Sequence, residues 1–200
     1  MGRWLRFLTT GVVALGLRAQ APVYTEVARS GFEMKGNAFS RATLEVDMDA
    51  VRRVLARPGA PGEEALVKVL KGMKDGRIRF RIRQGWEVDV SGSQRRAFNE
   101  RVAREVWRPL PPALKPSLER FLAHSERSVN PGQHWEHEAV GGGRMRSRYL
   151  EEPWKVWSDP NMAALFLGMY LEGPEETPGT RVDFRRGLSE RLARIPPIHP

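Results

Sequence analysis

The alternation of apolar and polar positions is clearest between residues 129 and 173, where it predicts a small antiparallel meander. The first strand is expected over residues 133–140, and the triple glycine at 141–143 reverses the chain because glycine accepts the positive φ of a tight turn. Residues 144–150 then form the partner strand. A third short strand follows over residues 154–157.

A helix is expected directly after this meander. Ser158 or Asp159 is suited to cap it, and Pro160 loses no hydrogen bond at the first helical position. Apolar residues then recur at helical spacing, which predicts one buried face. That face consists of Leu165, Phe166, Met169 and Tyr170, and Gly173-Pro174 ends the helix.

Residues 77–83 give the most regular strand pattern in the chain. Ile78, Phe80 and Ile82 point one way, and the four arginines at positions 77, 79, 81 and 83 point the other. Two interpretations stay open for the arginines. They form an exposed face paired with Glu87, Asp89 or acids on neighbouring strands, or they form a face that binds anions.

The remaining pattern predicts one further strand and five helices around these elements. Asp47, Ser93 and Thr180 are suitable N-terminal caps, and the inward face of the helix that Ser93 caps is expected to carry Ala97, Phe98, Val102 and Val106. The strand is predicted over residues 41–46, and the helices over residues 48–55, 63–71, 93–107, 117–127 and 180–195.

Together the elements predict an α+β fold, an antiparallel sheet covered on one face by a layer of helices. Residues 22–200 are expected to form a single domain and a monomer. Residues 1–21 are predicted to be a signal peptide. Arg3 and Arg6 precede an apolar run over residues 7–17, and Ala19-Gln20-Ala21 matches a cleavage pattern. We therefore expect an exported protein, periplasmic or secreted.

The net charge of +9 and the isoelectric point near 10.6 come mainly from arginine. Such a charge suits nucleic acid, an anionic membrane surface or an acidic ligand, but an exported protein rarely meets nucleic acid, so we expect no nucleic-acid partner. The absence of cysteine excludes disulfides and thiol chemistry.

No motif for metal binding or nucleophilic catalysis emerges from the sequence. His134 and His137 are three residues apart, and in a strand this spacing places them on opposite faces, where they cannot share one metal ion. No serine lies in a G-x-S-x-G turn, and Ser91-Gly92-Ser93 is explained as a strand-to-helix cap. We expect no metal site, no cofactor and no catalytic residue of these kinds.

Residues 41–192 nevertheless resemble the chalcone isomerase-like family. The resemblance rests on ATLEVD before the first helix, on RFRIRQGWEVDVSGSQRRAFNERV as strand and helix, and on SDPNMAALFLGMYLEGP. It implies a pocket between the sheet and the helices. Plant enzymes of the family close a flavanone ring there, with a guanidinium that holds the phenolate and nearby Tyr, Asn, Thr and Ser groups. Non-catalytic relatives bind fatty acids in the same cleft.

The catalytic set of the family is not retained in this chain. An ungapped match places Arg95 where the enzymes have tyrosine and Val102 where they have asparagine. Near the N-terminus, Glu33 stands close to the position of the family's arginine, and Arg29 is out of register. Without a cation placed to hold the oxyanion, the pocket lacks its main catalytic interaction.

The leading hypothesis is an exported, non-catalytic domain that binds a small apolar or amphipathic ligand, such as a fatty acid, between sheet and helices. Arg81, His134 and Tyr149 are the predicted ligand-binding residues. One alternative is an isomerase or lyase with a rearranged active site, which predicts a buried arginine beside a tyrosine or histidine in the cleft. Another is a basic module that docks on anionic envelope surface through the arginines of residues 77–83 and 144–148.

Overall fold

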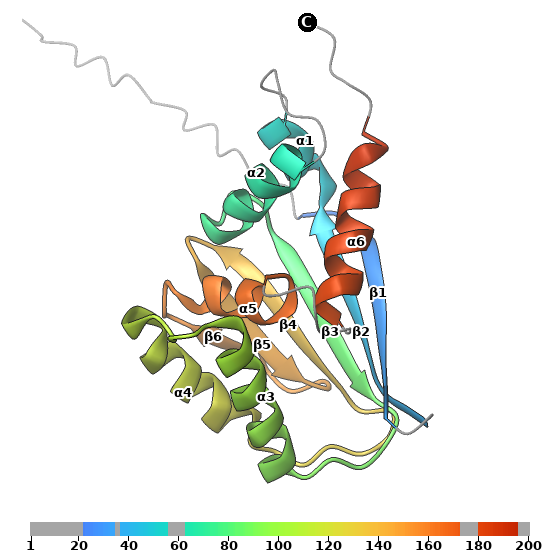
Figure 1. Cartoon of the computed structure of the whole chain (residues 1–200), viewed down its shortest axis with the longest axis vertical. Coiled ribbons are helices and arrows are strands. Elements are labelled where there is room, and N and C mark those ends of the chain that lie inside the picture. The colour runs from blue at the N-terminus through green and yellow to red at the C-terminus, as the bar shows by residue number, and fades with distance from the viewer. Residues whose placement is uncertain (1–21, 35–36, 56–62, 173–179, 196–200) are drawn as a thin grey trace, which may run out of the picture.

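The computed structural model describes residues 22–34, 37–55, 63–172 and 180–195, so the predicted signal peptide lies outside the described residues. Six antiparallel strands form one sheet in simple chain order (Figure 1). Every neighbouring pair along the chain is therefore also a neighbour in space. The strands are β1 (Tyr24–Met34), β2 (Asn37–Asp47), β3 (Phe80–Trp86), β4 (His134–Gly141), β5 (Arg144–Tyr149) and β6 (Lys155–Trp157).

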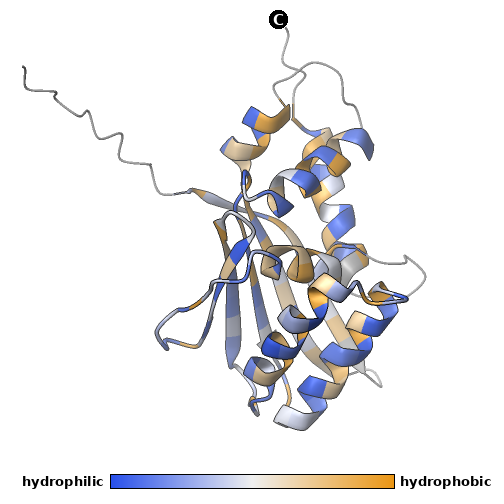
Figure 2. Cartoon of the chain, turned by 90° about the vertical axis from the view of Figure 1, so that its left-hand side faces the viewer, coloured by the Kyte–Doolittle hydropathy of each residue, from blue (hydrophilic) through white to orange (hydrophobic). Residues whose placement is uncertain are grey.

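The helices cover one face of this sheet (Figures 1 and 2). This arrangement confirms the predicted α+β class and the single helical layer. Among the described helices, none is long and apolar enough to cross a bilayer. They are α1 (Met48–Leu55), α2 (Glu63–Lys74), α3 (Gly92–Val106), α4 (Lys115–Ser125), α5 (Met162–Tyr170) and α6 (Thr180–Ala193), with a 3-10 turn over Pro112–Leu114.

The main core fills the space between the sheet and this helical layer. Leu44 of β2, Phe80 and Ile82 of β3, and Met145 of β5 are each fully buried on the helical face. Their neighbours in sequence point to the opposite, open face because successive side chains alternate across a strand. The predicted alternation of buried and exposed side chains is confirmed from Ile78 onward, but the strand spans Phe80–Trp86 rather than residues 77–83.

Helix α5 lies at the centre of the helical layer. It contacts α2, α3, α4, α6 and β5, and all of its residues except Ala164 are buried. The prediction of a single apolar face was wrong for this reason. The helix also begins at Met162 rather than near Pro160, because the Asp159 carboxylate accepts the backbone N–H of Asn161 and forms a turn first.

Other element boundaries also differ from the sequence expectation. Strand β1 was not predicted, because polar residues and Gly31 interrupt its apolar pattern. Helix α2 continues past Gly72 to Lys74, and a Cβ on Gly72 would lie 2.8 Å from Cδ1 of Ile78, so the Ile78 side chain packs directly on this glycine. Helix α3 is capped by Ser91 rather than Ser93, in a capping box with Gln94.

The open face of the sheet carries a ladder of ion pairs between strands. The Glu136 carboxylate accepts hydrogen bonds from Arg83 (2.6 and 2.9 Å) and from Nε of Arg148 (2.6 Å). The next carboxylate along β4, Glu138, accepts two from Arg146 at 2.7 and 3.0 Å. The structure therefore favours the interpretation in which acids on neighbouring strands neutralise the strand arginines.

This ladder predicts acid sensitivity that is traceable to Glu136. Burial raises the pKa of Glu136, but hydrogen bonds from Arg148 and Arg83 outweigh this and hold it below its ordinary value. A depressed folded pKa stabilises the fold above the unfolded value of about 4.3, and that contribution is lost as pH falls through the folded pKa. We expect Glu136→Gln to lower the free energy of unfolding at pH near 7 and to flatten its decline in acid.

Urea unfolding across a pH series measures this effect. Glu119→Gln is the matched control, because Glu119 forms an exposed ion pair with Arg96 that contributes little. An identical pH dependence in wild type and Glu136→Gln would contradict the account of the ladder.

Candidate ligand-binding site

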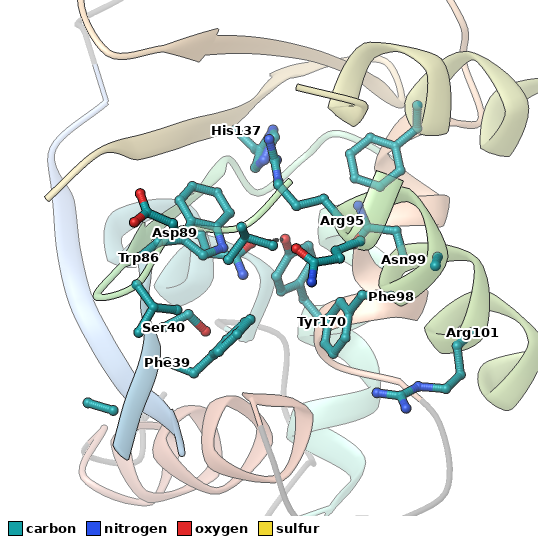
Figure 3. Close-up of a pocket in the computed structure, with 17 residues that line it drawn as sticks. Phe39, Ser40, Trp86, Asp89, Arg95, Phe98, Asn99, Arg101, His137 and Tyr170 are labelled. Carbon is teal, nitrogen blue, oxygen red and sulfur yellow. Dashed lines mark hydrogen bonds between the residues drawn. The ribbon is translucent and has the colours of Figure 1, made fainter. Parts of the chain in front are cut away.

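A cavity of about 700 Å³ lies between the sheet and helices α3, α4 and α5 (Figure 3). Its floor is formed by β2, β3 and β4, and its roof mainly by α3. Apolar and aromatic side chains line most of it, including Phe39, Trp86 and Phe121. The size and lining are typical of a site for a small organic molecule.

The cavity exists because α3 spans it without packing closely on the strands. At the start of the helix, a Cβ on Gly92 would lie 2.9 Å from the backbone nitrogen of Arg127. At its end, a Cβ on Gly168 of α5 would overlap the indole of Trp107, the C-cap residue. Both ends of α3 are thus held by close approach at a glycine, and the middle of the helix lies over the cavity.

Arg95 is the most unusual residue in the cavity wall. It lies in the first turn of α3 and is only 7% exposed. Its guanidinium stacks over the rings of Trp86 (4.5 Å) and Trp135 (4.9 Å), and Nη1 donates a hydrogen bond to the backbone carbonyl of Arg127 at 2.9 Å. Among the described residues no carboxylate forms an ion pair with it.

The electrostatic state of Arg95 follows from this environment. Burial lowers the pKa of the Arg95 guanidinium to about 10, so the group remains a cation at neutral pH. Burying a charge without an opposite charge is costly, and the two indole faces offset only part of that cost. The cavity wall therefore carries a fixed positive charge, and the guanidinium keeps further N–H groups that can donate to an anion in the cavity.

Tyr170 of α5 and Gln84 of β3 form a second polar feature of the cavity. The Tyr170 hydroxyl donates to Oε1 of Gln84 at 2.8 Å. Burial raises the pKa of Tyr170 to about 12, so it is a neutral phenol at physiological pH. Nearby on β2, Ser40 also lines the cavity and is 8% exposed.

His137 of β4 lines the cavity from the sheet side, and a hydrogen bond to Ser147 fixes its ring. Nδ1 of His137 lies 2.8 Å from Oγ of Ser147, and that oxygen accepts a hydrogen bond from the Trp157 indole at 3.0 Å. Burial lowers the pKa of His137 to about 3, so the ring is neutral. His134 points to the opposite face of β4, as the strand alternation predicts.

None of the three predicted ligand-binding residues lines this cavity. Arg81 lies on the open face of the sheet, between Glu45 (3.4 Å) and Glu138 (3.6 Å). His134 is on the open-face side of β4. Tyr149 faces the helices but packs with Trp135 in a separate cluster, where its hydroxyl donates to Gln133. The alternation of side chains along β3 and β4 turns Arg81 and His134 to the open face. Tyr149 misses the cavity because β5 lies beyond β4 in the sheet and contributes no lining residue.

The structure instead places Arg95 in the cavity, and the helical pattern alone did not identify it. Among the residues predicted to face inward from α3, Ala97 and Phe98 do line the cavity, but Ala97 is exposed and Phe98 is 37% exposed. The buried side of the helix carries Gly92, Arg95 and Ala103. One signal in the sequence did exist, because Arg95 occupies the position where the resembled enzymes have a tyrosine in their pocket.

Comparison with solved structures agrees with this architecture. A fatty-acid binding protein of Arabidopsis thaliana superimposes with a TM-score of 0.64 over 85% of this chain and 90% of that chain, at 16% sequence identity. The fold is of the chalcone isomerase-like type. Identity at this level shows the fold alone. No family model matches the sequence, and no curated protein matches it either.

The position of His137 leads to a direct spectroscopic prediction. With a pKa near 3, its imidazole remains neutral from about pH 5 to pH 8, a range in which an ordinary histidine with a pKa of about 6.5 gains a proton. We expect its ring ¹⁵N resonances to stay constant over that range. His137→Gln identifies the signals. A midpoint near 6.5 for the assigned ring would contradict the burial described above.

Proposed function

We propose that this protein is a non-catalytic binder of a long-chain carboxylic acid, with the carboxylate on Arg95 and the chain in the cavity. The observation that carries the proposal is the buried guanidinium, which has no acidic partner among the residues that the structure describes. A carboxylate matches the fork of donors on a guanidinium, and such charge-assisted bonds are among the strong ones. Binding the acid supplies the opposite charge that the described residues around Arg95 do not.

The rest of the cavity suits the hydrocarbon part of such a ligand. Phe39, Trp86, Val88 and Phe121 offer apolar surface along the floor and roof. Each methylene removed from water contributes about 0.8 kcal/mol, so a long chain gains several kcal/mol from this contact. Asp89 is exposed in the wall of the cavity. Its negative charge disfavours the reverse orientation of the ligand, with the carboxylate beside it.

The shared fold supports the same ligand class. The Arabidopsis protein with this architecture is a fatty-acid binding protein. The likeness establishes only the fold, so the ligand of this chain is inferred from its own cavity. Membership of the chalcone isomerase-like family is part of the same proposal, and it rests on the fold together with the motifs in residues 41–192.

An isomerase or lyase with a rearranged site is the second candidate, because a buried arginine does lie with a tyrosine and a histidine in the cleft. Arg95, Tyr170 and His137 all line the cavity. Their protonation states favour binding over catalysis. The pKa of Tyr170 near 12 and the pKa of His137 near 3 leave neither group suited to take a proton at neutral pH.

Replacing Arg95 tests the proposal. We expect Arg95→Met to raise the dissociation constant for stearate by about ten- to a hundredfold, because a hydrogen-bonded charge pair contributes about 1.5–3 kcal/mol. Isothermal titration calorimetry on delipidated protein measures the change. The variant should remain folded, because replacing a buried charge with an apolar side chain of similar length removes a desolvation cost.

Arg104→Met is the matched control for this experiment. Arg104 lies on the same helix, is exposed and pairs with Glu100. The control variant should bind stearate like the wild-type protein. Equal affinity in wild type and folded Arg95→Met would overturn the proposed function, as would wild-type protein that binds no long-chain acid.

A further inference from the structure

The floor of the cavity carries two polar groups that the proposed carboxylate site does not use. Ser40 is buried in the cavity floor, and its hydroxyl has no hydrogen-bond partner among the residues that the structure describes. Gln84 uses Oε1 to accept from the Tyr170 hydroxyl, and its amide nitrogen has no described partner. Each group therefore has at least one donor available to a ligand.

The strand register places these two groups side by side. Ser40 lies opposite Trp86, and Ala42 lies opposite Gln84, in the antiparallel pair of β2 and β3. Ser40 and Gln84 are thus diagonal neighbours on adjacent strands, and both face the cavity. The bond from Tyr170 orients the Gln84 amide, because an acceptor that is fixed in place also fixes the direction of its N–H groups.

The pair is separate from the cation that receives the carboxylate. Arg95 belongs to the roof, on α3, whereas Ser40 and Gln84 belong to the floor, on β2 and β3. In Figure 3, Ser40 and Arg95 lie on opposite sides of Tyr170. A ligand that places its carboxylate on Arg95 therefore meets Ser40 and Gln84 with another part of its chain.

A plain hydrocarbon chain is a poor match for that part of the floor. Methylene groups would displace water from Ser40 and Gln84 and leave buried donors without partners, which is unfavourable. An oxygen atom at that point accepts hydrogen bonds from both. A second carboxylate fits less well, because Asp89 lines the same cavity and lies on the same side of Tyr170 as Ser40.

We propose that the ligand is an oxygenated long-chain acid, whose hydroxyl or keto oxygen along the chain binds the Ser40 hydroxyl and the Gln84 amide. This inference rests on the proposed function, since it assumes that the carboxylate occupies Arg95. It adds a second recognition point, and that point sets the preference among long-chain acids. A site that hydrogen-bonds a ligand oxygen discriminates against the analogue that lacks it.

Calorimetry with stearate and a series of monohydroxystearates, which differ in the carbon that bears the hydroxyl, tests the inference. We expect at least one regioisomer to bind wild-type protein about tenfold more tightly than stearate. The preference should peak at one position and fall on either side, because the distance from the carboxylate to the hydroxyl must match the distance from Arg95 to the pair.

Two variants locate the effect. Ser40→Ala should remove most of the preference for the best isomer and leave stearate binding equal or tighter. Gln84→Glu keeps an oxygen for the Tyr170 hydroxyl but removes the amide donors, and it should lose the preference as well. Thr43→Ala is the control, because Thr43 lies on the same strand and faces the opposite side of the sheet.

The outcomes separate this inference from the proposed function. Stearate binding that depends on Arg95, with no isomer bound more tightly than stearate, would overturn the second recognition point alone. The same would follow if folded Ser40→Ala and Thr43→Ala showed equal preference for the best isomer. Failure of every acid to bind would overturn the carboxylate site and this inference together.

Discussion

The guanidinium of Arg95 is a buried positive charge, and no described carboxylate balances it inside the protein. Two indole rings and one backbone carbonyl hold it in the cavity wall. Such a group is costly to bury, and the cost is recovered when an anion binds. The fold is arranged to keep this charge in place. The capping box begins α3 one turn before Arg95, and the close contacts at Gly92 and Gly168 fix the ends of that helix.

The arginines on the two faces of the sheet differ in whether a carboxylate neutralises them. On the open face, Arg83 and Arg148 share the buried carboxylate of Glu136, so charge is balanced within the protein. On the helical face, no described carboxylate pairs with the Arg95 cation at the cavity. Aromatic packing supports that side, since Phe166 of α5 lies against both Phe121 (5.0 Å) and His137 (4.5 Å). Helix α5 thereby links the cavity floor to the helices above it.

Much of the fold was predictable because its determinants are local. The period of two in residues 77–83, the triple glycine at 141–143 with its positive φ values, and the caps of several helices each depend on nearby residues. Strand β1 was missed because its pairing with β2 and its packing against α6 outweigh a weak local pattern. The same non-local packing surrounds α5 on all sides, which its sequence spacing did not reveal.

The site was harder to predict because it departs from the rules that identify a core. Patterns assign buried positions to apolar residues, and Arg95 is a buried charge on a largely polar helix. Arg81 was a reasonable choice from composition, but the alternation that correctly oriented Ile82 also directs Arg81 to the open face. The match to the resembled family set Arg95 at a pocket position, but it was taken only as the loss of a catalytic tyrosine, so neither the resemblance nor hydrophobic spacing predicted Arg95 as a ligand-binding residue.

The most direct measurement is the titration of ¹³C-carboxyl-labelled stearate bound to the protein, followed by NMR. If the carboxylate lies on the buried guanidinium, its pKa falls below the ordinary carboxyl value of about 4.3, because the cation favours the charged form. The account predicts that the bound resonance stays that of the ionised form from about pH 8 down to about pH 4. A bound carboxyl that titrates at or above the ordinary value would contradict it, because a carboxyl buried without a cation has a raised pKa.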